Sequence, residues 1–127
     1  MKETELSEKV IPPIDYSSAL ERLEGDKLFL TELLGIYTED FPKKYNSLKE
    51  AINHENFKLI QEIGHCLKGS SASLSLISLR ETGFQMELAG REKNIEKAKT
   101  TLIELKKEFT RLKHFLAAKK PIWPSTL

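Results

Sequence analysis

The sequence predicts an all-α fold, an antiparallel up-and-down four-helix bundle with a short extra N-terminal helix. Apolar residues recur at spacings of three, four and seven through most of the chain, which is the pattern of helices with one buried face. Runs of β-branched residues with a period of two, which would indicate strands, are absent from the sequence. Four long apolar stripes joined by short polar segments bury one another most economically as an antiparallel bundle.

The composition predicts a single water-soluble domain. The 127 residues are 39% hydrophobic and 31% charged, and this length suffices to bury a core. Prolines lie near both ends of the chain, where they interrupt regular structure. We therefore expect a bundle over residues 15–118, with tails over 1–14 and 119–127. No apolar run reaches the ~20 residues of a membrane span, and the N-terminal segment lacks the apolar stretch of a signal peptide. The single cysteine, Cys66, excludes an internal disulfide, and we therefore expect a cytoplasmic protein without membrane contact.

Helix boundaries are predicted from capping residues and turn signals. The typical N-cap residues at the expected helix starts are Asp15 or Ser17, Asp26 and Asn56. The first helix is expected to end before Gly25, and the long second helix to kink just before Pro42, which cannot donate a backbone hydrogen bond. A fourth helix is expected over about 77–89, closed by the polar segment 90–94, and the last helix carries a seven-residue apolar repeat over 95–116.

The segment 64–72, Gly-His-Cys-Leu-Lys-Gly-Ser-Ser-Ala, is the most informative part of the chain. On a helix, His65 lies about 200° of rotation from Leu67 and its inward-pointing neighbours, so it faces away from the core. Lys68 and Gly69 follow at the third and fourth positions after it, which places all three on one surface patch. A glycine inside a helix costs about 1 kcal/mol relative to alanine, which favours a position where another molecule approaches the backbone closely.

This arrangement suits phosphoryl transfer. An exposed imidazole is mostly neutral at pH 7, so one ring nitrogen of His65 has a free lone pair and can act as a nucleophile toward phosphorus. The ammonium group of Lys68 can offset charge on the phosphoryl oxygens. Gly69 leaves room for a partner that carries the phosphate.

At these residues the chain resembles a known family. The string His65-x-Leu67-Lys68-Gly69-Ser70-Ser71-Ala72-x-Leu74 is similar to the phosphorylation-site motif of histidine-containing phosphotransfer (HPt) domains of multistep phosphorelays. The segment Leu23-Glu24-Gly25-Asp26 and the pair Phe41-Pro42 also fit that family, and the resemblance covers roughly residues 15–118. Two positions depart from the family pattern, which usually has alanine in place of Gly64 and glycine in place of Ser75.

The resemblance implies a phosphocarrier that is not an enzyme in its own right. His65 would be the phosphoacceptor through Nε2, Lys68 would stabilise the phosphoryl group, and Gly69 would open the surface to the partner. Supporting roles near the histidine would fall to Ser70, Glu87 and Arg91. The chain would bind no metal or cofactor itself, because Mg²⁺ belongs to the partner receiver domain. The implied partners are response-regulator receiver domains and a hybrid sensor histidine kinase, and the chain itself is expected to be a monomer.

Three other interpretations remain open at this point. The seven-residue repeat over 95–116 is also typical of a coiled-coil dimer, although four apolar stripes in one chain favour the intramolecular bundle. The bundle is also compatible with a helical interaction module that carries no phosphoryl group. A lysine-rich C-terminal part, with a net charge of +6 over 65–127, is compatible with nucleic-acid binding, but acidic residues are interspersed and the footprint is weak.

The remaining reactive side chains do not form a site in the sequence. His54 and His114 are far from His65 along the chain, so we expect no metal centre. Cys66 points about 100° away from its neighbour His65 and cannot pair with it as a nucleophile. We expect Cys66 to be a small packing residue.

Overall fold

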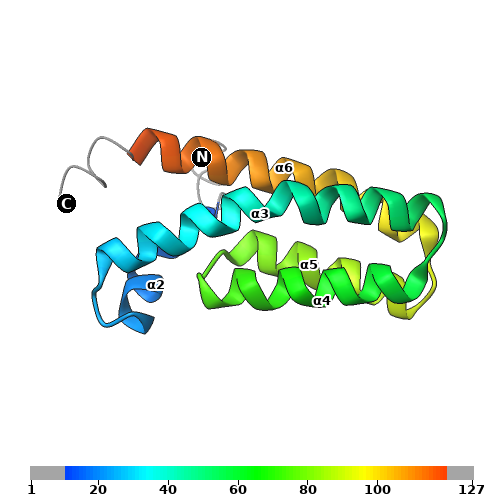
Figure 1. Cartoon of the computed structure of the whole chain (residues 1–127), viewed down its shortest axis with the longest axis horizontal. Helices are drawn as coiled ribbons and strands as arrows, with labels where there is room; N and C mark the ends of the chain where they lie inside the picture. The colour runs from blue at the N-terminus through cyan, green and yellow to red at the C-terminus, as the bar shows by residue number, and fades with distance from the viewer. Residues whose placement is uncertain (1–10, 120–127) are drawn as a thin grey trace, which may run out of the picture.

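The computed structural model describes residues 11–119, which form five helices and no strand. The helices are α2 (Tyr16–Arg22), α3 (Lys27–Asn53), α4 (Phe57–Ser73), α5 (Ile77–Arg91) and α6 (Ile95–Lys119). The four long helices run alternately in opposite directions, and the short α2 lies at one end of the bundle (Figure 1). The predicted all-α bundle with a short N-terminal helix is confirmed. Most of the two expected tails, residues 1–10 and 120–127, lies outside the described residues.

Each turn between helices repeats the same local chemistry. Before α2, α3 and α4, the side chain of the expected N-cap accepts a hydrogen bond from a backbone N–H in the first turn; these caps are Asp15, Asp26 and Asn56. Each turn that separates two helices contains a residue in the left-handed backbone region: Glu24, Glu55, Ser75 and Lys93, with φ between 51 and 57°. Turns this short place consecutive helices side by side and antiparallel.

Ser75 is one of the two departures from the HPt pattern, which usually has glycine at this position. Its φ of 57° lies in the left-handed backbone region, which glycine adopts without strain. Its hydroxyl donates to the hydroxyl of Ser18 in α2 at 3.1 Å, and its carbonyl accepts from the N–H of Asp15. The serine thus adds a side-chain contact between the α4–α5 turn and α2.

The core lies between the four long helices and includes one buried polar bond. Phe41 of α3 and Phe109 of α6 stack with ring centroids 3.8 Å apart. Tyr37 of α3 and Ser71 of α4 share a hydrogen bond of 2.8 Å between their hydroxyl groups, and both side chains are buried. Burial raises the pKa of Tyr37 to about 12, so its phenol stays protonated at all physiological pH values.

The course of α3 and the end of α5 can be compared with the predictions from the sequence. The helix α3 continues through Pro42 without a break, and Figure 1 shows its axis changing direction near the middle, where the kink was expected. The helix α5 ends at Arg91, two residues beyond the expected end at residue 89. Gly90 lies within the helix, and α4 packs closely against it: a Cβ at Gly90 would meet the backbone nitrogen of Gln61 at 2.4 Å.

Close contact between α4 and α5 positions the site described below. A Cβ at Gly64 of α4 would lie 2.4 Å from the backbone nitrogen of Glu87 in α5, which is too close for any side chain. A Cβ at Gly83 of α5 would lie 2.7 Å from the backbone nitrogen of Lys68 in α4. The two helix backbones therefore approach one another on both sides of the turn that carries His65.

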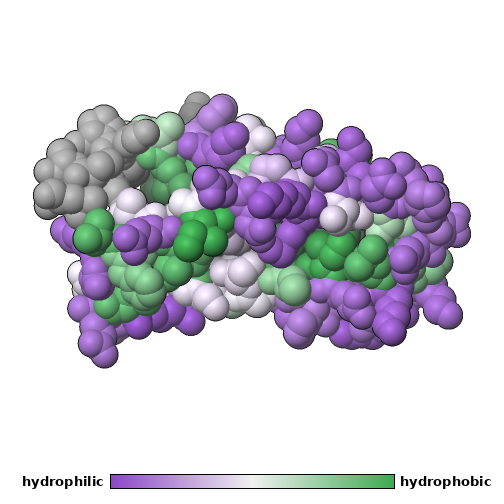
Figure 2. All heavy atoms as spheres, in the orientation of Figure 1, coloured by the Kyte–Doolittle hydropathy of each residue, from purple (hydrophilic) through white to green (hydrophobic). Residues whose placement is uncertain are grey.

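Hydrophobic residues also reach the surface. Figure 2 shows them at the α2 end of the bundle and between α3 and α4. The largest exposed apolar side chains are Ile11, Leu28, Phe29, Ile36 and Ile103. None of the helices in residues 11–119 is both long enough and apolar enough to cross a membrane.

Candidate functional site

His65 lies near the middle of α4, on the side of the helix that faces away from the core. Its side chain is 68% exposed, and the inward stripe of α4 is formed by Ile60, Leu67 and Ser71 instead. One turn further, a Cβ at Gly69 would meet no atom within 4 Å, so this glycine has no packing role. The backbone of α4 is therefore accessible at the surface one turn beyond the imidazole.

Glu87 of α5 is the centre of a polar cluster around this histidine. Its side chain is only 7% exposed, and its Oε2 lies 3.2 Å from Nδ1 of His65. Its Oε1 lies 2.8 Å from Nζ of Lys68. The guanidinium of Arg91, one turn further along α5, lies 3.3 Å from Oε2. One nearly buried carboxylate therefore contacts the imidazole and two cations.

These contacts keep Glu87 ionised. The hydrogen bond from Lys68 is the largest cause that lowers the pKa of Glu87, and the hydrogen bond from His65 lowers it further. Burial acts in the opposite direction and is outweighed. Because an ionised carboxylate can only accept hydrogen bonds, Nδ1 of His65 is the donor in this contact. The neutral ring is therefore the tautomer with a proton on Nδ1 and the lone pair on Nε2.

Lys68 is held in place by two groups. Besides its ion pair with Glu87, its Nζ lies 5.3 Å from the centroid of the Phe84 ring. About a third of the side chain is exposed, and the ammonium group binds the same carboxylate as the imidazole of His65. The cation is therefore positioned before any phosphate arrives.

Five of the six predicted site residues lie together, and Ser70 does not join them. The five are His65, Lys68, Gly69, Glu87 and Arg91. The hydroxyl of Ser70 donates to backbone carbonyl groups of its own helix, at 3.0 Å to Cys66 and 3.4 Å to Leu67. Ser70 instead lines a groove between α3 and α4.

This groove has a volume of about 260 Å³ and a mainly apolar lining. Its apolar lining residues are Leu33, Ile36, Tyr37, Phe41, Leu67 and Leu74. The ion pair of Asp40 with Lys44 lies at the same groove. The exposed Ile36 and Ser73 continue the lining toward the outer face of α3 and α4.

The prediction that Cys66 is a small packing residue is wrong. The thiol is exposed, because the buried stripe of α4 passes through its neighbour Leu67 and helix geometry turns the preceding position about 100° toward solvent. The thiol and the imidazole of His65 are not hydrogen-bonded to each other in the described part of the chain.

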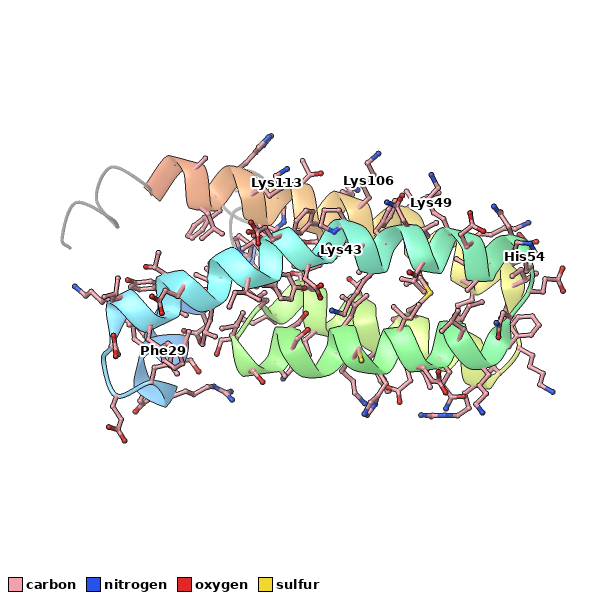
Figure 3. The ribbon with its side chains drawn as sticks, viewed as in Figure 1. Phe29, Lys43, Lys49, His54, Lys106 and Lys113 are labelled. Carbon is pink, nitrogen blue, oxygen red and sulfur yellow. The ribbon has the colours of Figure 1, made fainter. Side chains whose placement is uncertain are left out.

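The lysine-rich last helix is largely a mixed-charge surface. Ion pairs link four of its basic residues to neighbouring carboxylates: Lys97, Lys99, Lys107 and Arg111. Figure 3 shows Lys106 and Lys113 of α6 and Lys43 and Lys49 of α3 extending outward from the bundle. This alternation of charges supports the interpretation as a solvated helix face rather than a nucleic-acid footprint.

Within residues 11–119, no group of three or more histidine, cysteine, aspartate or glutamate side chains is arranged to hold a metal ion. The polar cluster itself contains one carboxylate and two permanent cations, which is a poor ligand set for a cation and a good one for an anionic group. The site is therefore suited to a phosphoryl group.

Sequence reasoning missed how central Glu87 is. The sequence placed Glu87 only loosely, as a polar residue near the histidine, and assigned no contact to Gly64. The signal was present in the chain: Gly64, Gly83 and Gly90 occur at spacings that put small residues on the facing sides of two consecutive helices. Such glycines let two helix backbones approach closely, and Glu87 lies between the last two of them.

Comparison with known proteins identifies the family of the chain. The model of the family described as Hpt domain matches residues 32–115, which run from α3 to α6 and include all of α4 and α5. No curated protein and no solved structure matched the chain. Because the family match covers more than half of the chain, the protein belongs to the Hpt domain family, and the resemblance noted from the sequence is confirmed. Members of this family are phosphocarriers of phosphorelay systems that interact with receiver domains, and they are not kinases.

Proposed function

We propose that this protein accepts a phosphoryl group on Nε2 of His65 from the aspartyl phosphate of one receiver domain and passes it to a second receiver. The observation that carries the proposal is the imidazole itself, which is 68% exposed on α4 with its Nδ1 bound by Glu87. A ring fixed at Nδ1 presents Nε2 as the nucleophilic nitrogen.

The neighbouring residues support that chemistry. Lys68 would contact the phosphoryl oxygens as they leave the aspartyl group, since its ammonium is already held by the carboxylate that binds the imidazole. Gly69 would let the receiver backbone approach within contact distance of α4, because no atom of residues 11–119 lies within 4 Å of a Cβ built there. The receiver would supply Mg²⁺ and most of the in-line stabilisation, while the bundle supplies a positioned nucleophile.

The receiver would dock over His65 and extend onto the apolar groove between α3 and α4, which Leu67 and Ser70 of α4 line. Ile36, which is 61% exposed, and the half-exposed Phe29 lie on α3 and would be covered by the partner. Burial of such apolar surface stabilises a complex by about 25 cal/mol per Å², and this contribution does not depend on fixed charge pairs. This suits a carrier that must bind two different receivers in turn and release each one.

A transfer assay tests the proposal. The labelled aspartyl phosphate of a receiver from the same genome is mixed with the full chain, and acid-labile, base-stable label on this chain is measured. We expect label on the unchanged protein and none on His65→Gln. The matched control is His54→Gln, which alters an exposed histidine at the end of α3 and should accept label normally.

Two results would contradict the proposal. Normal labelling of His65→Gln would move the acceptor to another residue. Absence of label from every receiver of the genome, with receivers still bound in a pull-down, would favour the interaction module without phosphotransfer.

A further inference from the structure

We propose that Glu87 retains the proton on Nδ1 of His65 throughout the phosphorylated state, so that the phosphoryl group is held in its readily transferred form. The inference deepens the proposed function and rests on it. It starts from the unusual concentration of contacts at one carboxylate: Nδ1 of His65 at 3.2 Å, Lys68 at 2.8 Å and Arg91 at 3.3 Å.

The proton on Nδ1 decides how well the imidazole leaves phosphorus. In the first step, the Nε2 lone pair of the neutral ring attacks phosphorus, the P–O bond to the receiver aspartate breaks, and its electron pair returns to the aspartate oxygen. The product is a phosphoimidazolium ring that still carries the Nδ1 proton. In the second step, a carboxylate oxygen of the next receiver attacks phosphorus, the P–N bond breaks, and its electron pair returns to Nε2 as neutral imidazole.

Neither step requires a proton to enter or leave when the Nδ1 proton stays in place. If that proton were lost between the steps, the leaving group would be an imidazolate anion, which is far less stable and would leave slowly. A neutral acceptor at Nδ1 can bind the proton but cannot neutralise the positive ring. An ionised carboxylate does both.

The charges around the ring indicate that Glu87 is the group that stabilises its protonated form. From α5 the ring contacts Glu87, and the same carboxylate binds Arg91 of α5 and Lys68 of the ring's own helix. The exposed Glu62 lies one turn before the ring on α4. On α3, the charged groups that line the groove with α4 are Asp40 and Lys44, which pair with each other. The two cations beside the ring oppose a positive imidazolium, so Glu87 is the group that allows it to remain protonated. Its low exposure, 7%, limits screening by water.

A spectroscopic titration tests the proposal on the full chain. The protein carries ¹⁵N-labelled histidine and is phosphorylated with phosphoramidate. The ¹⁵N shift of Nδ1 in phospho-His65 is followed against pH and compared with free phosphohistidine. We expect Nδ1 to remain protonated to a higher pH in the protein than in the free compound.

Glu87→Gln is the informative variant, since the amide fits the same space without the charge. We expect the Nδ1 midpoint to fall by about one pH unit or more in this variant. We also expect transfer to a receiver at pH 8 to slow about tenfold, while the phosphohistidine becomes more resistant to hydrolysis. The matched control is Glu21→Gln, which removes the same charge from an exposed position on α2, at the end of the bundle, and should leave the midpoint unchanged.

The possible outcomes separate the two proposals. A phosphorylated His65 whose Nδ1 loses its proton at the same pH as free phosphohistidine overturns this inference and leaves the carrier function standing. An equal midpoint in the unchanged protein and in Glu87→Gln overturns it as well. Failure of His65 to take up phosphate at all would overturn both.

Discussion

Gly64 lies against the backbone of Glu87, and this contact brings the carboxylate to the histidine. A Cβ at position 64 would fall 2.4 Å from the Glu87 nitrogen and 2.8 Å from its Cα. No other residue type fits there without moving α5 away from α4. Because His65 is the next residue along α4, the same approach that excludes a side chain at position 64 places Oε2 of Glu87 3.2 Å from Nδ1 of His65.

Gly64→Ala should therefore weaken both the fold and the site. Overpacking against a fixed backbone costs typically about 1–3 kcal/mol, and the gain in helix propensity does not offset it. We expect the free energy of unfolding, measured by urea denaturation, to fall by about this amount, and transfer from a receiver to slow as Glu87 shifts from the ring. A variant as stable as the unchanged protein would show that α5 can move without cost.

Gly69→Ala should have the opposite effect on stability. The added methyl group meets nothing within 4 Å, and replacing a helical glycine by alanine typically stabilises by about 0.5–1 kcal/mol. We nevertheless expect slower phosphoryl uptake, because the methyl group stands where the receiver approaches. Urea denaturation and initial transfer rates, measured on the same preparation, check the two effects. Faster or unchanged uptake would remove Gly69 from the docking surface.

Lys68→Ala should slow phosphoryl uptake without abolishing it. The nucleophile remains, but the cation that offsets phosphoryl charge is lost, and we expect a decrease of about tenfold or more, which corresponds to about 1.4 kcal/mol in the barrier. Single-turnover transfer from a phosphorylated receiver measures this directly. Lys58→Ala, an exposed lysine on the same helix, should transfer at the normal rate. Equal rates for both variants would assign Lys68 a purely structural role.

The stability of the bundle should depend on pH through Glu87. The pKa of Glu87 is lowered in the folded state, first by the hydrogen bond from Lys68, so its contribution is fully present above the ordinary carboxyl pKa near 4.5. That contribution is lost as the pH falls through the lowered value. We expect the difference in unfolding free energy between the unchanged protein and Glu87→Gln to shrink as the pH is taken from 6 toward 3. A difference that stays constant over this range would show that the carboxylate is not stabilised by its partners.

Much of the fold could be predicted because the local signals agree. Asp15, Asp26 and Asn56 act as N-caps where capping chemistry indicated them, and the seven-residue repeat of the last helix lies in the core. Such signals depend only on neighbours along the chain, so a single sequence contains them.

The contacts of the site were harder to predict because they join different helices. His65, Lys68 and Gly69 lie within one turn, and helix geometry alone places them on one face. The contacts of Glu87 depend instead on how closely α4 and α5 approach, which three glycines distributed over both helices determine. The misassignment of Cys66 has a different origin: helix geometry already turns this position about 100° from Leu67 in the buried stripe, and the prediction followed the small apolar residue type instead.

The most direct test of the central claim is a chase experiment. The chain is labelled from one phosphorylated receiver, separated from it, and mixed with a second, unlabelled receiver from the same genome. The account predicts that label leaves His65 and is recovered as aspartyl phosphate on the second receiver, within seconds to minutes and without ATP. Label that stays on the chain in the presence of every receiver, or that was never bound to His65, would contradict it.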